Sequence, residues 1–364
     1  MVDQLENIIG QPLAVKQLHS LKENNRIPHA FLFTGPAGVG KFLTAIQFTK
    51  LLNDPKNFRK IEKLDEPHVK YIIPLPRGKG EISESSGLEK LNDNQLKDYH
   101  EQIKKKIENP YHKIQIEDAN IIKISSIREI RKFLSLEYED IKYRVIIIDD
   151  AHLMNTEGQN SLLKSLEEPP DGVIFILLTP YDKKLLPTIH SRCWTIRFNG
   201  LSHDDITNIL IEKFNIKKEE AKRTALFSNG SVHTALELIE NNMSELLEST
   251  IQILRFSLGG WFNSAYIEFK HATDEFERGK VKDILFLILT WLNDIQKNKI
   301  DFRNYYFEDY QETLQKFNKN FPNANISKIY DTVDELILSM DKNILLNVII
   351  LNLILQLNLI STGK

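Results

Sequence analysis

Residues 35–41 contain three glycines and a lysine, and their place between two regular elements restricts what the chain can fold into. The segment follows an apolar run and opens a helical pattern at its lysine. Glycines let the backbone curl so that successive N–H groups point inward at an anion, and the helix amino terminus adds partial positive charge. A lysine there reaches the terminal phosphates of a bound chain. The sequence therefore predicts a phosphate-binding loop with these binding residues: Gly35, Gly38, Val39, Gly40 and Lys41.

The position after the lysine departs from this pattern, because it holds Phe42. Phosphate loops place a Ser or Thr hydroxyl there to bind Mg²⁺, whereas a phenyl ring offers the metal no ligand. A glycine turn that only links a strand to a helix therefore remains a second interpretation. If the loop does bind phosphate, we expect ATP or ADP to bind weakly, and Mg²⁺ to bind only together with the nucleotide.

A second motif is the apolar run Arg144–Ile148, which is followed directly by two carboxylates, Asp149 and Asp150. In a nucleotide hydrolase the first acid holds Mg²⁺ through water, and the second polarises the attacking water. Most such enzymes place Glu second, and because Asp150 is one methylene shorter, the water is harder to reach. Asp149 is thus a candidate cofactor-binding residue and Asp150 a weak catalytic candidate. The alternative is that both acids simply face solvent.

Apolar runs and amphipathic helical stretches alternate from Glu6 to about Phe198, which is typical of a parallel sheet covered by helices. Two of the runs are almost wholly apolar, as expected of central strands buried on both faces. The helical pattern Thr156–Leu166 lies between them and ends before a pair of prolines. The fold class is therefore α/β, a doubly wound parallel sheet with these predicted strands: Ala30–Phe33, Ile121–Ile124, Arg144–Ile148, Val173–Leu178 and Trp194–Phe198.

Two helical regions follow this α/β domain, which we assign to residues 1–198. Residues 199–242 are predicted to form a small helical lid, and residues 243–364 a C-terminal all-α domain. The predicted helices are Asp204–Phe214, Lys218–Phe227, Ser231–Ile239, Leu246–Leu258, Lys280–Ile295 and Ile326–Met340. The segment Asn343–Ile360 is apolar nearly all round, which indicates burial inside a bundle or against a partner subunit.

Residues 54–115 are predicted to be an irregular insert in the α/β domain. Residues 74–87 have the composition of an exposed loop, and Asn94–Glu108 that of a charged helix. The lysine run 104–106 is interpreted as a solvated helix end, which the helix dipole favours, rather than as a DNA site.

The composition argues against several classes of function, among them proteins that bind nucleic acid through overall charge and proteins that span a membrane. The 364 residues include 47 basic and 50 acidic ones, so no global positive field attracts nucleic acid or anionic lipid. No apolar run reaches the roughly 20 residues of a membrane span, and the first ten residues lack the features of a signal peptide. We therefore expect a cytoplasmic protein with no membrane partner. Its single cysteine, Cys193, cannot form an internal disulfide or a cysteine-rich zinc site.

Several motifs occur together and in order, and they resemble one protein family. The chain is similar to bacterial replicative clamp-loader subunits of the AAA+ class, and more closely to the delta-prime family of DNA polymerase III. The resemblance implies an AAA+ P-loop domain, a helical lid and a C-terminal helical collar. The residues that carry it are Ile8–Gln11, Pro28–Gly35, Ile148–His152, Asn160–Pro170 and Leu185–Cys193.

The resemblance also assigns a role to Arg192. Ser191-Arg192-Cys193 matches the family's serine-arginine-cysteine motif, whose arginine projects across a subunit boundary toward ATP bound by the neighbouring subunit. A forked guanidinium suits this role because it neutralises charge that builds on the transferred phosphoryl oxygens. Arg192 is therefore the candidate arginine finger in trans, and an ordinary surface arginine is the alternative. Cys193 is expected to be a buried apolar residue rather than a reactive thiol.

The chain departs from its ATP-hydrolysing relatives at further positions. In those relatives the helix entered at Gly230-Ser231 presents an arginine to the γ-phosphate, but here the turn reads Val232–Ala235. The polar sensor expected after Val173–Leu178 falls on Thr179. Delta-prime relatives often carry a cysteine-rich zinc module after the phosphate-loop helix, and because residues 54–115 contain no cysteine, zinc is not expected.

The resemblance implies a subunit of the replicative clamp loader within the DNA polymerase III holoenzyme, which helps to load the sliding clamp on primed DNA. Its own ATP site would be degenerate, and Arg192 would complete the site next door. The implied partners are the gamma/tau and delta subunits, the sliding clamp, and primer–template DNA held by the assembly. Two alternatives remain: an autonomous or gamma-like AAA+ ATPase that hydrolyses ATP in cis, and a direct DNA-binding module.

Overall fold

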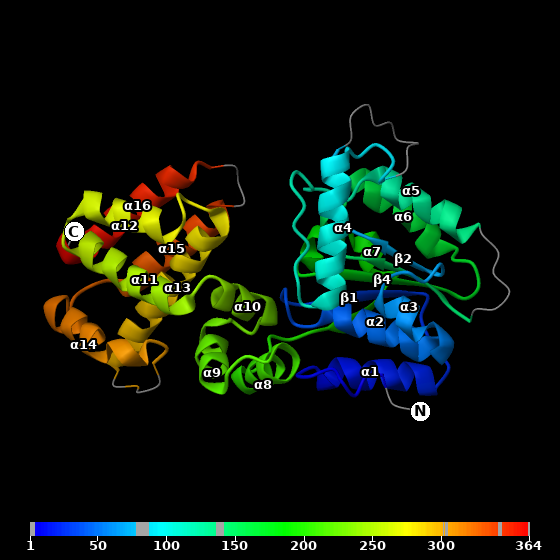
Figure 1. The fold of residues 1–364 in the computed structure, drawn as a ribbon, viewed down its shortest axis with the longest axis horizontal. Coiled ribbons are helices and arrows are strands. Elements are labelled where there is room, and N and C mark those ends of the chain that lie inside the picture. Colours follow the sequence, from blue (N-terminus) through cyan, green and yellow to red (C-terminus); the bar gives the residue numbers. More distant parts are fainter. Residues whose placement is uncertain are drawn as a thin grey trace. The chain divides into compact units, whose positions relative to one another are not determined.

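The computed structural model of the chain describes residues 4–77, 87–135, 142–300, 302, 305–340 and 344–362. The chain divides into two compact units. One consists of Met1–Ala221 with Asn229–Thr234, and the other of Lys222–Ser228 with Ala235–Lys364. Figure 1 shows the sheet with its helices in the first unit and the all-helical second unit.

The first unit is built on a five-stranded sheet in which every pair of neighbouring strands is parallel. The strand order is β2-β3-β4-β1-β5, so the first and fourth strands lie side by side near the centre. The strands are β1 (Ala30–Thr34), β2 (Val69–Ile72), β3 (Arg144–Ile148), β4 (Val173–Thr179) and β5 (Trp194–Arg197). Because all strands run the same way, the segments that follow β1, β3 and β4 meet at one edge of the sheet.

Helices cover both faces of this sheet, as Figure 1 shows for α1 and α2 on one side and α5 and α6 on the other. Successive side chains of β1 serve opposite faces. Leu32 packs in a core cluster with residues of α5, α6 and α7, whereas the ring of Phe31 lies 5.3 Å from that of Phe48 in α2. The helices of this unit are α1 (Pro12–Glu23), α2 (Lys41–Leu52), α3 (Phe58–Glu62), α4 (Asp93–Glu108), α5 (Ile124–Leu134), α6 (Thr156–Glu167), α7 (Pro187–His190) and α8 (His203–Phe214).

The α/β class is confirmed, but one predicted strand is wrong. Ile121–Ile124 is not a strand: Ile122 makes one isolated bridge with Met154, and α5 begins at Ile124. The strand that completes the sheet is β2, which lies inside the region predicted as irregular. Because β2 is an edge strand, Lys70 and Tyr71 stay partly exposed, and the polar residues around them interrupt the apolar run that marks a central strand.

The second unit is a bundle of helices around α13, whose buried side chains include Trp291. Its helices are α11 (Met243–Leu258), α12 (Phe262–Ala272), α13 (Arg278–Lys299), α14 (Gln311–Asn320), α15 (Ile326–Ser339) and α16 (Leu346–Thr362). The helices predicted over residues 246–258, 280–295 and 326–340 are confirmed as α11, α13 and α15. Among the described residues, the structure contains no helix with the length and apolar character needed to cross a membrane.

Two further helices, α9 (Lys218–Phe227) and α10 (Val232–Glu240), contribute residues to both units. Their positions agree with the helices predicted over 218–227 and 231–239. The domain boundaries placed at residues 198 and 242 stay a prediction.

A carboxyl in the second unit predicts a pH dependence of stability. Burial, and then the nearby Glu237 carboxylate, raise the pKa of Asp283 to about 6 in the folded chain. Because this value lies above that of an unfolded aspartate, the folded state loses stability as the pH rises through 6 and the buried group ionises. We expect Asp283→Asn, which keeps an acceptor for Asn241, to raise stability at pH 7.5 by about 2 kcal/mol.

The measurement is thermal unfolding by circular dichroism at pH 4 and pH 7.5, with Asp331→Asn on the exposed face of α15 as the control. At pH 4 the folded carboxyl is protonated and the unfolded one is only about half ionised, so the benefit of the substitution should be much smaller than at pH 7.5. An equal benefit at both pH values would contradict the assignment.

Candidate nucleotide site

The loop after β1 adopts backbone conformations that require glycine. Gly35 has φ 144°, and a Cβ atom there would lie 2.1 Å from the backbone oxygen of Phe198. Gly38 has φ 70°, and its Cβ would lie 2.2 Å from the Ser231 hydroxyl. The glycines therefore let the loop approach β5 and the start of α10, and α2 begins at Lys41 as predicted.

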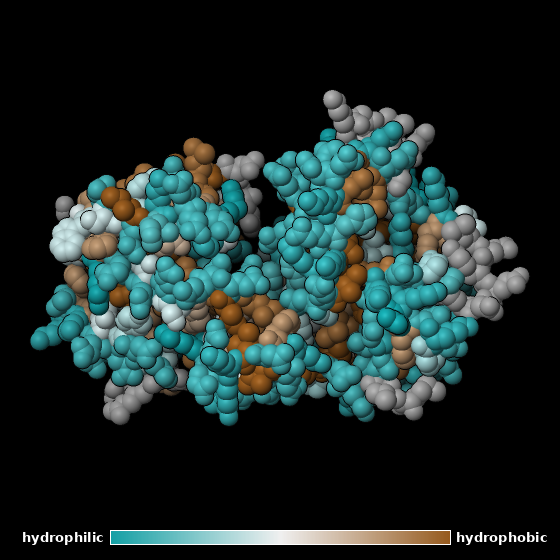
Figure 2. Space-filling view, in the orientation of Figure 1, coloured by the Kyte–Doolittle hydropathy of each residue, from teal (hydrophilic) through white to brown (hydrophobic). Residues whose placement is uncertain are grey.

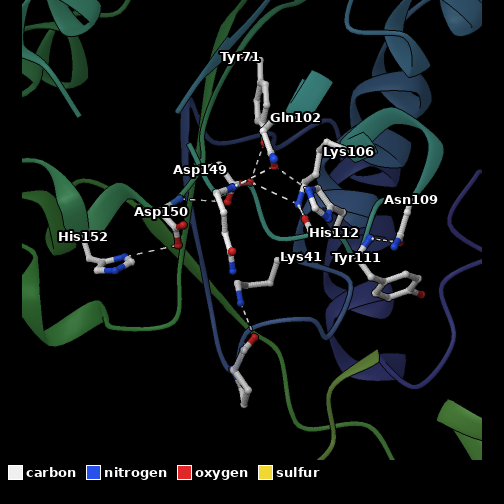
Figure 3. Close-up of polar contacts among 12 residues, drawn as sticks. Lys41, Tyr71, Gln102, Lys106, Asn109, Tyr111, His112, Asp149, Asp150 and His152 are labelled. Atoms are coloured by element: carbon white, nitrogen blue, oxygen red, sulfur yellow. Dashed lines mark hydrogen bonds and ion pairs between the residues drawn. The ribbon is translucent and has the colours of Figure 1, made fainter. Parts of the chain in front are cut away.

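Lys41 is buried, and its ammonium group is held by the loop itself. Its Nζ donates to the backbone oxygens of Gly35 at 2.7 Å and Pro36 at 2.5 Å, and Figure 3 shows it directed at the loop. Burial lowers the pKa of Lys41 to about 8, although the carboxylates of Asp149 and Asp150 act in the opposite direction. The lysine that would reach a terminal phosphate is thus engaged with loop carbonyls.

Phe42 fills the position where a metal-binding hydroxyl would stand. The side chain is buried, and the centroid of its ring lies 5.2 Å from that of Tyr71 in β2. The ammonium of Lys106 lies over the Phe42 ring, 4.6 Å from its centroid. Phe42, Tyr71 and Lys106 therefore lie together at the start of α2.

Asp149 has neighbours at both carboxylate oxygens. Its Oδ2 accepts a 2.7 Å hydrogen bond from the Tyr71 hydroxyl and lies 3.6 Å from the Nζ of Lys106. Its Oδ1 accepts from the backbone N–H of Asp150 at 3.1 Å. Burial, followed by the Asp149 carboxylate, raises the pKa of Tyr71 well above its ordinary value, so the phenol stays a donor.

Lys106 contradicts its interpretation as part of a solvated helix end. The side chains of Lys104 and Lys105 are 75% and 50% exposed, but that of Lys106 is only 8% exposed. Its Nζ also donates to the backbone oxygen of His112 at 2.6 Å. Lys106 continues the apolar stripe that holds α4, three residues after Ile103, and this helical spacing is the signal that could have found it.

Asp150 takes a different environment from Asp149. It lies in the left-handed region with φ 50°, and its Oδ1 is 3.9 Å from Nδ1 of His152. Burial and then the Asp149 carboxylate raise the pKa of Asp150. Burial also lowers the pKa of His152 to about 4, so this imidazole is neutral at pH 7. The first acid is thus paired with a cation, while the second lies beside a neutral ring.

The remaining residues predicted near the loop do lie at this edge of the sheet. Thr179 ends β4, where its backbone oxygen accepts from Gly35 N–H at 3.3 Å and its hydroxyl accepts from Tyr181 N–H at 3.0 Å. The N–H of Val232, in the first turn of α10, donates to the Gly38 oxygen at 3.0 Å. This contact ties the phosphate loop to the first turn of α10.

Arg192 lies at the opposite edge of the sheet, because it precedes β5 whereas the phosphate loop follows β1. These strands are parallel, with Phe31 beside Trp194 and Thr34 beside Arg197. At about 3.3 Å per residue, the paired segment alone puts roughly 10 Å between the two edges. The side chain of Arg192 is 34% exposed, forms a 2.7 Å ion pair with Glu167 and donates to the backbone oxygen of Thr188.

Cys193 is partly buried and packs against the sheet core. Burial raises the pKa of its thiol to about 12, so the thiolate that makes a cysteine reactive is not formed at pH 7. This placement agrees with the expectation of an apolar residue.

These features define a class: a P-loop α/β domain of the AAA+ type, with its phosphate loop after β1 and its acidic pair after β3. Residues 10–202 match the family described as DNA polymerase III, delta subunit. The chain therefore belongs to this family of clamp-loader subunits.

Named relatives carry different subunit labels. The chain is 32% identical to DNA polymerase III subunit gamma of Buchnera aphidicola subsp. Schizaphis graminum over 65% of its length and 58% of that protein. It is 28% identical to subunit delta' of Bacillus subtilis over 67% of its length and 63% of that protein. It covers only 38% of subunit tau of B. subtilis, at 27% identity. Thus the chain spans less than two thirds of each of these relatives.

Among solved structures, a gamma subunit-related protein of Thermotoga maritima aligns over 94% of this chain and 98% of its own. The TM-score is 0.47 and the identity 15%.

Gln11 joins the phosphate loop to the segment after β5, and we expect its loss to destabilise the first unit. Its side-chain amide donates to the backbone oxygens of Val39 at 3.3 Å and Asn199 at 2.8 Å, and its Oε1 accepts from Asn199 N–H. Gln11→Ala leaves these buried groups unpaired and should cost about 1–3 kcal/mol in urea unfolding. The control is Leu13→Ala at a 66% exposed side chain, where we expect a change within about 0.5 kcal/mol. Equal effects would contradict this role.

Proposed function

We propose that this chain serves the clamp loader by donating Arg192 to ATP bound in a neighbouring subunit, while its own phosphate loop does not hydrolyse ATP. The placement of Arg192 at the sheet edge opposite its own phosphate loop carries this proposal. Within the family, the proposed role is that of delta-prime. The proposed partners are the gamma/tau and delta subunits and the sliding clamp, with primer–template DNA contacted through the assembly.

The chain's own loop supports the first half of this proposal. Lys41 donates to loop carbonyls, Phe42 replaces the metal-binding hydroxyl, and the Asp149 carboxylate is paired with a lysine. AAA+ relatives bind nucleotide with Mg²⁺. For a nucleotide to bind in that way here, Lys41 would have to leave the loop carbonyls and Lys106 would have to leave Asp149. We therefore propose that ATP or ADP binds weakly at Gly38–Lys41, with Thr179 and Asp149 nearby. We also propose that Asp150 does not position a water for attack on the nucleotide.

The surroundings of Arg192 support the second half. Its pair with Glu167 is solvent-accessible, since their side chains are 34% and 48% exposed. Exposed ion pairs contribute only about 0–1 kcal/mol, so Glu167 can be exchanged for a phosphate at small cost. In the proposed role, Glu167 and the Thr188 backbone oxygen hold the guanidinium ready until a neighbouring subunit presents its nucleotide.

We expect Arg192→Ala to lower DNA-stimulated ATP turnover in a loader reconstituted with its partner subunits. At the site that an arginine finger serves, its loss typically reduces the rate about 10³–10⁵-fold. Arg192→Lys should not restore the rate, because an ammonium lacks the forked geometry of a guanidinium. Arg197→Ala, at the exposed end of β5, is the matched control and should retain turnover.

Undiminished turnover with Arg192→Ala would remove the trans role. The cis alternative has its own test in the purified chain, where we expect no ATP turnover. Turnover that Lys41→Ala abolishes would establish an autonomous ATPase instead.

The surface of α16 supports the proposal that residues 243–364 form an oligomerising collar. One side of this helix is buried in the bundle, with Ile350 and Leu353 fully buried. The opposite side exposes apolar residues at helical spacing, and Figure 2 shows such side chains at the surface over the position of α16. The exposed apolar residues of α16 are Val348 at 55%, Leu351 at 48%, Leu355 at 53% and Leu359 at 41%.

We expect Leu351→Asp/Leu355→Asp to prevent entry of the chain into the loader, because charges would enter an apolar contact. The isolated variant should keep its helical circular dichroism, since both side chains are exposed in the single chain. Assembly with the partner subunits is followed by size-exclusion chromatography. Lys319→Asp, at an exposed position of α14, is the control and should assemble normally. Normal assembly of the leucine variant would exclude α16 from the collar contact.

A further inference from the structure

Lys106 is held in place by contacts from several elements. The helix that carries it, α4, begins with a capping box formed by Asn92 and Gln95. Gln102, one turn earlier on α4, accepts from Gln115 N–H at 3.1 Å and contacts the His112 ring at 2.8 Å. The His112 backbone oxygen in turn accepts from Lys106. Contacts with other residues of the chain thus hold the Lys106 side chain in place (Figure 3).

Lys106 faces the two carboxylates that would serve a metal and a water in a nucleotide hydrolase. Burial lowers the pKa of Lys106, while the carboxylates of Asp149 and Asp150, which follow β3, act in the opposite direction. Lys41 at the start of α2 also disfavours the charge on Lys106. Three lysines, Lys41, Lys106 and Lys113, act on the Asp150 carboxylate. The aromatic face of Phe42, 4.6 Å from the ammonium, adds a cation–π contact.

These residues do not fit a divalent ion. Mg²⁺ requires near-octahedral oxygen ligands at about 2.0–2.1 Å, of which the protein usually supplies one or two. Phe42 supplies none, and the Asp149 oxygens already accept from Tyr71 and the backbone N–H of Asp150. A positive group lies 3.6 Å from the same carboxylate, so an added divalent cation would meet repulsion rather than a vacant acceptor.

We propose that Lys106 is a built-in cation that takes the place of Mg²⁺ on Asp149. Residues 54–115 would then have a definite task, because α4 delivers this lysine to the carboxylate that relatives use for metal. The phosphate loop consequently keeps its shape without metal and gains nothing from Mg²⁺. The inference concerns only the chain's own loop and does not depend on Arg192.

The test compares thermal unfolding of the full chain in MgCl₂ with that in EDTA at matched ionic strength. The wild type and the exposed control Lys104→Met should have the same Tm in both buffers. Lys106→Met should lower Tm in EDTA by several degrees, because the partly buried Asp149 carboxylate loses its cationic partner. In this variant MgCl₂ should raise Tm, since the carboxylate is now open to a metal.

A charge-removing double variant separates the ion pair from a general packing loss. Asp149→Asn/Lys106→Met should regain part of the lost Tm in EDTA and should no longer respond to MgCl₂. A wild-type Tm that rises with MgCl₂ would overturn the proposal, as would a Lys106→Met variant that behaves like Lys104→Met. A double variant that is no more stable than Lys106→Met would also overturn it. None of these outcomes bears on ATP turnover by the assembled loader.

Discussion

The ion pair between Lys106 and Asp149 is the contact on which the chemistry of the phosphate-loop edge depends. The Asp149 carboxylate is 20% exposed, and a partly buried charge is stabilised by a partner of opposite sign. Nucleotide-hydrolysing sites leave that partner to a metal that arrives with the substrate, whereas this chain provides a side chain of its own. The choice has a consequence for the loop: with the charge already balanced and Lys41 bonded to loop carbonyls, the loop is stable without a ligand.

Much of the fold could be predicted from the sequence, because its central strands are buried on both faces and read as apolar runs. β3 and β4 are of this kind, and the glycine loop correctly indicated the start of α2 at Lys41. The edge strand β2 could not be found in the same way, since Lys70 and Tyr71 interrupt its apolar pattern. Ile121–Ile124 was wrongly predicted as a strand because it is short and apolar. Its last residue begins the amphipathic helix α5.

The candidate site was predictable where its residues belong to a local motif, and not where it is completed from a distance. Asp149 follows its strand directly, but its two partners come from β2 and α4, 78 and 43 positions away along the chain (149 − 71 and 149 − 106). A run of three lysines at a helix end reads as solvated, and for Lys104 and Lys105 that reading is correct. Only the spacing of the apolar stripe distinguishes Lys106, and its meaning depends on a tertiary contact with Phe42.

A parallel sheet separates the two halves of ATP chemistry, because loops after its strands and loops before them lie at opposite edges. In this chain the edge after the strands is filled by its own side chains, while the edge before β5 keeps an exposed arginine. Gln11 joins Val39 of the loop to Asn199 after β5, and Val232 donates to Gly38. In the proposed role, Arg192 is positioned by Glu167 and the Thr188 backbone oxygen, away from the phosphate loop of its own subunit. A fixed arginine suits a subunit whose task is to complete a site on its neighbour.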